Sequence, residues 1–139
     1  MTLSNRTRTI GYWLATGVAA LAFAVPGVGN LSRVPQIAVD MAHLGYPPYF
    51  LTVLGTWKLL GAAAIVVPRF PRLKEWAYAG MIFDLTGAAI SRAVSGDGVL
   101  TVIEPLLIGA LVAASWALRP EGRMLKSPAP GTSLGSGAR

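Results

Sequence analysis

The sequence contains no cysteine, so disulfides, thiol redox relays and cysteine-ligated zinc or iron–sulfur sites are excluded. His43 is the only histidine, and one chain therefore cannot build a bis-histidine haem site or a His-rich metal centre. We expect no bound metal, and any redox role would require an organic cofactor or a partner protein.

Charged residues are also scarce. They make up 13% of the 139 residues, whereas hydrophobic residues make up 53%. This composition is too apolar for an ordinary soluble domain and favours a single domain whose partner is the lipid bilayer. The net charge of +6 does not indicate nucleic-acid binding, because the basic residues stand at the ends of apolar runs and form no patch among aromatics.

Four apolar segments are each close to the roughly 20 residues that a helix needs to cross a bilayer. Strands are excluded because four of them cannot close a barrel in lipid. The sequence therefore predicts an all-α membrane protein, a bundle of four transmembrane helices at residues 10–31, 49–67, 75–94 and 100–118. Residues 1–9 precede this 10–118 domain, and the Pro-, Gly- and Ser-rich stretch 119–139 is expected to be a disordered tail.

Lysine and arginine in the short loops set the expected orientation. Basic residues precede the first helix, separate the second from the third and follow the fourth, which predicts that both termini are cytoplasmic. An alternative for the first segment is a cleaved signal peptide, but its apolar run continues past the Ala22–Ala24 site to Leu31 and favours a retained helix. Residues 32–48 are too short and polar to cross, and we expect a short helix there on the outer surface.

Two opposite charges stand at the middle of predicted membrane helices. Lys58 and Asp84 lie at similar depth on neighbouring antiparallel helices, and each alone would cost at least about 2.5–3.5 kcal/mol at mid-bilayer. We therefore expect them to pair inside the bundle. Arg92 and Glu104, near the outer ends of the third and fourth helices, are the second expected pair.

These four charges would line an interior cavity that is open to the outer side, with Asn30 and His43 at its wall or mouth. Intramembrane ionisable residues are candidates for function, so we take Lys58, Asp84, Arg92, Glu104, His43 and Asn30 as a ligand-binding site or buried polar network. The competing interpretation is that the pairs only fix helix packing. For His43, an ordinary surface position is the simpler reading. Glycines such as Gly61, Gly80 and Gly87 are expected at close contacts between helices.

The segment Leu44 to Ala93, with its runs "WKLLG", "FPRLKEWAYAG" and "FDLTGAA", resembles the DoxX-like family of small bacterial four-helix membrane proteins. The resemblance implies the bacterial inner membrane and a link to quinone-dependent oxidases. Many members carry a glutamate where Lys58 stands. Members with "WKLLG" tend to have Ser-His where this chain has Ser91-Arg92, and arginine cannot release a proton near neutral pH.

Three functions stay open at this point, and no catalytic residue can be assigned. The first is an accessory subunit that binds a quinone or other lipophilic molecule and serves a membrane oxidoreductase. The second is a small membrane enzyme that performs acid–base chemistry, of the isomerase type, on a hydrophobic substrate. The third is a structural or interaction protein, which could form a homo-oligomer through small-residue faces.

Overall fold

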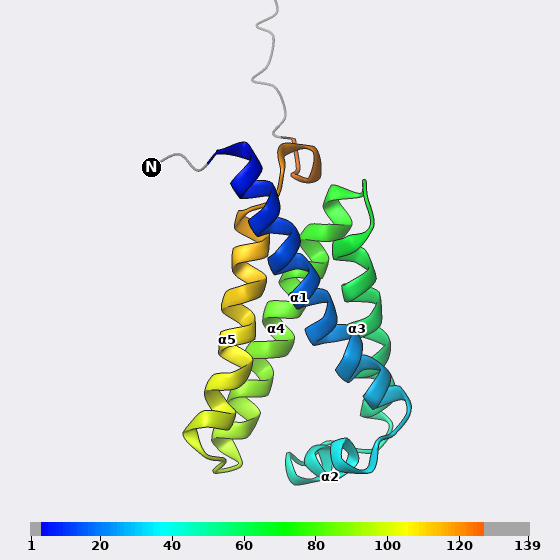
Figure 1. The fold of residues 1–139 in the computed structure, drawn as a ribbon. Coiled ribbons are helices and arrows are strands. Elements are labelled where there is room, and N and C mark those ends of the chain that lie inside the picture. The colour runs from blue at the N-terminus through cyan, green and yellow to red at the C-terminus, as the bar shows by residue number, and fades with distance from the viewer. Residues whose placement is uncertain (1–3, 127–139) are drawn as a thin grey trace, which may run out of the picture.

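A computed structural model describes residues 4–126 of the chain (Figure 1). These residues form five α-helices, α1 (Asn5–Leu31), α2 (Pro35–His43), α3 (Phe50–Val66), α4 (Pro71–Val94) and α5 (Val99–Ala117), followed by a short 3₁₀ helix, η1 (Glu121–Arg123). The all-helical prediction is confirmed for the described residues, which contain no strand, and the short helix expected between residues 32 and 48 is α2.

Two of the long helices begin earlier than hydropathy predicts. The Ser4 hydroxyl accepts a hydrogen bond from the Thr7 N–H and caps α1, so the helix starts in the polar segment before the apolar run. Pro71 occupies the first turn of α4, where its fixed φ and missing N–H are compatible with a helix. The ends of apolar runs therefore mark where side chains become polar and not where these helices begin.

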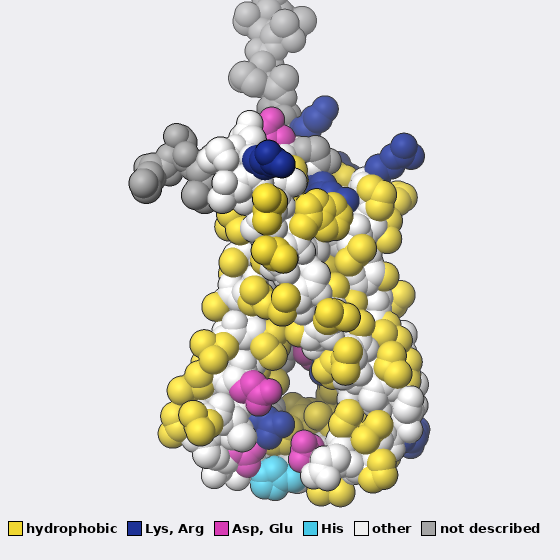
Figure 2. Space-filling view, viewed as in Figure 1, with side chains coloured by type: hydrophobic (Ala, Val, Ile, Leu, Met, Phe, Trp, Pro, Cys, Tyr) yellow, Lys and Arg dark blue, Asp and Glu magenta, His cyan; other side chains and the backbone are white. Residues whose placement is uncertain are grey.

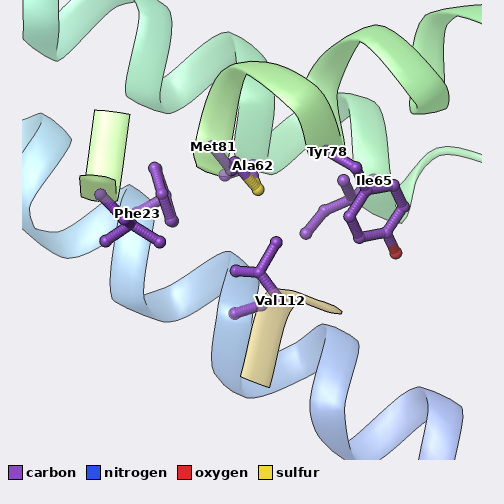
Figure 3. Close-up of a cluster of buried hydrophobic side chains, with 8 residues drawn as sticks. Phe23, Ala62, Ile65, Tyr78, Met81 and Val112 are labelled. Carbon is purple, nitrogen blue, oxygen red and sulfur yellow. The ribbon is translucent and has the colours of Figure 1, made fainter. Parts of the chain in front are cut away.

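The four long helices pack side by side, with α1 against α3 and α5, and α4 against α5 and α3. In Figure 1 the α1–α3 pair and the α4–α5 pair diverge toward one end of the bundle, and α2 lies across that end. Where the two pairs meet, a buried cluster joins all four helices. Figure 3 shows its members facing one another, including Phe23 from α1, Ile65 from α3, Met81 from α4 and Val112 from α5.

The α1–α3 contact depends on two glycines that face each other. A Cβ built on Gly55 would lie 2.8 Å from the carbonyl oxygen of Gly27 and 2.7 Å from Cγ of Leu31. A Cβ on Gly27 would likewise lie 3.3 Å from the Gly55 carbonyl oxygen. Backbones approach this closely only where side chains are absent, as is common between helices in membranes. Gly80 and Gly87, by contrast, have no heavy atom within 4 Å of a built Cβ, so the prediction that they are contact glycines was wrong.

The α3–α4 turn is held in an unusual backbone conformation. Arg69 and Phe70 are consecutive non-glycine residues with positive φ, 69° and 54°. This conformation is unfavourable for L-residues by about 1–2 kcal/mol each. It persists because Lys74, in the first turn of α4, reaches back with its Nζ to the backbone carbonyls of Ala64, Ile65 and Val67.

Two helices, α1 and α5, are long and apolar enough to cross a membrane by themselves, and α3 is a shorter apolar helix of 17 residues. Although α4 has 24 residues, charges including Lys74, Asp84 and Arg92 lower its hydropathy.

The chain after α5 folds back onto the bundle. Arg119 is only 4% exposed, and Arg123 donates a hydrogen bond to the Tyr12 hydroxyl, 3.2 Å away. The predicted disordered tail was therefore placed too early, because residues 119–126 have a defined position. Residues 127–139 lie outside the described part of the chain.

Candidate functional site

The contact predicted between Lys58 and Asp84 is present. The Nζ atom of Lys58, from α3, lies 3.8 Å from Oδ2 of Asp84, from α4, and both side chains are about one-fifth exposed. They stand just beyond the buried cluster, because Ala62 follows Lys58 by one turn and Met81 precedes Asp84 by one turn. The charges thus occupy the point where the two helix pairs begin to diverge.

A cavity of about 340 Å³ between α3 and α4 includes this pair in its lining. Its other walls are almost entirely apolar and include Phe23, Leu54, Trp57, Leu60, Trp76 and Met81. The two tryptophans are strongly exposed on the outer surface of the bundle, whereas Phe23, on α1, is buried. The cavity therefore extends from the side of the bundle inward to α1, with two charged groups among apolar walls.

The Lys58–Asp84 pair is loose. Its separation of 3.8 Å exceeds the roughly 2.7–3.2 Å of a hydrogen bond, so the contact is an ion pair without a short hydrogen bond. The ammonium has three donors and the carboxylate two acceptor oxygens. The two groups are ion-paired with each other, and each keeps donors or acceptor oxygens that a bound molecule could use.

Asn30, also predicted for this region, is 2% exposed near the end of α1. Its Nδ2 has no hydrogen-bond partner among the described residues. The residue lies against Gly55 of α3, one turn from Gly27, which in turn contacts Lys58. An unpartnered buried amide therefore lies within about two helical turns of the charged pair.

The predicted partner of Arg92 was wrong. In the described residues Arg92 pairs with Asp97, 3.1 Å away in the α4–α5 turn, and with Asp40 of α2 at 4.0 Å. Glu104 is exposed on α5 and takes part in no ion pair there. The tight turn between α4 and α5 places Asp97 five residues after Arg92, where its carboxylate accepts a hydrogen bond from the guanidinium.

His43 belongs to the same outer cluster. Its Nε2 lies 2.6 Å from Oδ1 of Asp97, while the ring remains about half exposed. The hydrogen bond with His43, followed by that from Arg92, lowers the pKa of the Asp97 carboxyl below its ordinary value. Asp97 therefore stays ionised and joins α2 to the end of α4.

On the other side of the buried cluster, three hydroxyl side chains form a second polar cluster inside the bundle. The hydroxyls of Thr16 and Ser115 lie 2.6 Å apart, and the Tyr78 hydroxyl lies 2.8 Å from that of Ser115. All three residues are buried, and their hydroxyls satisfy one another across α1, α4 and α5. Each of these three hydroxyls has a hydrogen-bond partner within the protein, in contrast to the Lys58–Asp84 site.

The end of the bundle opposite α2 is held by two buried cations, Lys74 and Arg119. Lys74 is completely buried and bonded to three carbonyls at the end of α3. Arg119 pairs with Glu75 at 2.6 Å, and its guanidinium lies 5.3 Å from the Tyr78 ring centroid. The sequence indicated only that Lys74 and Arg119 flank the membrane. Burial could have been suspected for Lys74 because it follows Pro71 by one turn and can reach the end of the preceding helix.

The described residues form an all-helical bundle in which two helices are long and apolar enough to span a membrane. An ion pair, Lys58–Asp84, lines an apolar cavity in this bundle. The chain belongs to the DoxX-like family, which it matches over residues 14–115, from within α1 to the last turn of α5. This confirms the resemblance seen in the sequence and identifies a membrane protein in contact with lipid. No curated protein and no solved structure matches the chain.

Proposed function

We propose that this protein crosses the bacterial inner membrane four times and binds a quinone, or another lipophilic molecule with hydrogen-bonding oxygens, in the cavity between α3 and α4. The proposed spans are α1, α3, α4 and α5, with both termini in the cytoplasm. The protein acts as an accessory subunit, and its oxidoreductase partner is the source or acceptor of the ligand.

The topology is supported by the distribution of charge. At about 1.5 Å per residue, the 17 residues of α3 extend about 25 Å, close to the hydrocarbon thickness of about 30 Å. The intramembrane charge of α4, Asp84, is paired with Lys58. Exposed arginines, among them Arg6, Arg69 and Arg72, lie at the end opposite α2, where Figure 2 shows basic side chains around the rim. This is the arrangement of a cytoplasmic end.

The observation that carries the ligand proposal is the Lys58–Asp84 ion pair, with its atoms 3.8 Å apart, beside an apolar cavity. A ligand carbonyl can accept a hydrogen bond from the Lys58 ammonium, and a ligand hydroxyl can donate one to the Asp84 carboxylate. The two groups together suit a molecule that carries either or both. A ring or chain would be covered by aromatic walls such as Phe23 and Trp57, and the lateral position of the cavity lets it enter from the bilayer.

The same pair could exchange a proton with a bound substrate, which is the basis of the alternative acid–base enzyme. The two functions differ in one outcome. An accessory subunit binds its ligand unchanged and co-purifies with an oxidoreductase, whereas an enzyme converts its substrate without a partner.

The cavity can be filled without touching the charged pair. Gly80 lines the cavity and has open space where a side chain would lie, so Gly80→Leu fills part of it. Gly87→Leu is the matched control, since Gly87 is on the same helix, is equally unobstructed and is outside the cavity lining.

In the experiment, the native protein and each variant are titrated in lipid nanodiscs with a short-tailed ubiquinone. Binding is measured by the quenching of tryptophan fluorescence. We expect the Kd to rise at least tenfold, about 1.4 kcal/mol, for Gly80→Leu and to stay unchanged for Gly87→Leu. Equal binding by both variants, or no binding by the native protein, would contradict the proposal for this probe.

A further inference from the structure

The α2 helix has little to hold it by packing. None of its nine residues is buried. One of its apolar contacts is made by Ile37, whose Cδ1 lies against Gly29 of α1. A helix with so little buried surface is stabilised mainly by its remaining contacts and can move away at small cost.

Those remaining contacts are polar, and they cross to the other helix pair. His43, at the end of α2, is hydrogen-bonded to Asp97, and Asp40, one turn earlier, faces Arg92 at 4.0 Å. Just after α2, the Tyr46 hydroxyl lies 2.7 Å from that of Ser91 on α4. Thus α2 is attached covalently to the α1–α3 pair and by side chains to the α4 end.

What lies behind α2 is an opening in the bundle. Figure 2 shows it where the two helix pairs diverge, with apolar walls and with acidic, basic and histidine side chains between it and the end of the molecule. Lys58 and Asp84 stand at the inner limit of this divergence, and the buried cluster beyond them closes the interior. With the bundle in a membrane, the sides of the opening would face lipid, and an aqueous route from this end to the pair would run past α2, which lies across the end.

We propose that α2 is a gate over an aqueous entrance to the Lys58–Asp84 pair, latched by the His43–Asp97 hydrogen bond and by the weaker Asp40–Arg92 ion pair. With the latch formed, the pair is accessible only from the bilayer, through the lateral cavity. With the latch broken, α2 swings away on its connections to α1 and α3, and solutes from the outer aqueous phase reach the interior.

The absence of native cysteine allows a direct test of access. Ala88 is half-buried on α4, one turn beyond Asp84 toward α2 and on the same face. Ala88→Cys provides a reporter whose reaction with a charged, membrane-impermeant maleimide can be timed in nanodiscs. The latch is broken by Asp97→Asn and, separately, by His43→Ala. The control is Glu121→Gln, which removes the same charge from an exposed position at the opposite end of the bundle.

We expect both latch variants to raise the labelling rate about tenfold, equivalent to about 1.4 kcal/mol of latch stability, and the control to leave it unchanged. Circular dichroism establishes that each variant is folded. An unchanged labelling rate in a folded latch variant would overturn the gate. The gate would also be overturned if Ala88→Cys, with the latch intact, reacted as fast as Val39→Cys, a cysteine at an exposed position. Because no ligand is used, failure here would leave the quinone proposal standing, and the reverse also holds.

Discussion

Replacing Gly55 by alanine tests whether backbone contact between α1 and α3 is what holds the first helix pair together. The added Cβ would meet the Gly27 carbonyl oxygen at 2.8 Å and Leu31 Cγ at 2.7 Å, both shorter than real Cβ contacts. Backbone cannot yield as a flexible side chain does, so we assign an overpacking cost of about 2–3 kcal/mol. Alanine recovers up to ~1 kcal/mol in helix propensity. The net expected loss is about 1–2 kcal/mol.

In the assay, the purified protein is unfolded by increasing SDS in mixed micelles, and its helix content is monitored by circular dichroism. The control is Gly87→Ala, on a helix surface with open space around it, which should leave stability unchanged or raise it by up to ~1 kcal/mol. The opposite signs of the two substitutions are the substance of the prediction. If Gly55→Ala unfolds at the same SDS fraction as Gly87→Ala, the close α1–α3 approach is not what the structure indicates.

Three further predictions concern the ends of the bundle. Lys74→Met strands three carbonyls at the end of α3 and should cost about 2–4 kcal/mol in the same assay, whereas Arg72→Met, at an exposed position, should change stability by less than ~0.5 kcal/mol. Ser115→Ala removes the hydroxyl that bridges those of Thr16 and Tyr78 and should lower the free energy of unfolding by about 1–3 kcal/mol. A change within error of zero would refute the stabilising role of these buried hydrogen bonds. The pKa of Asp97 is lowered chiefly by its hydrogen bond with His43, so the stabilising contact is fully present above the ordinary pKa of 3.8 and is lost as pH falls through the lower folded-state pKa. A carboxyl ¹³C titration with its midpoint at or above 3.8 would contradict this contact.

Much of the fold follows from hydropathy because helices are the structure that a chain can form in lipid. The predicted segment 49–67 differs from α3 by one residue at each end. The Lys58–Asp84 contact was also predictable, since two opposite charges at one depth on adjacent helices have few other partners in a membrane. Helix starts were less accessible, because Ser4 and Pro71 act through backbone geometry that hydropathy does not measure.

The pairing of Arg92 could not be read from the sequence. Its contact with Asp97 depends on the geometry of the α4–α5 turn, and its contact with Asp40 depends on α2 lying across the end of the bundle. The choice between Gly55 and Gly80 as contact positions was equally hidden, because both lie in apolar helices and only the rotation of each helix decides which glycine faces a neighbour. Rotation about the helix axis is set by packing against other helices, and the composition of one segment carries little information on it.

The most direct test of the central claim is to ask what the native protein carries. Protein purified in mild detergent would be examined by native mass spectrometry and by organic extraction, with Lys58→Met alongside and circular dichroism to establish that both are folded. The account predicts a quinone-like or other lipophilic molecule bound to the native protein and lost from the variant, because the ammonium supplies the donors for its oxygen. A folded native protein that is empty, or a variant that retains the same molecule at the same occupancy, would contradict it.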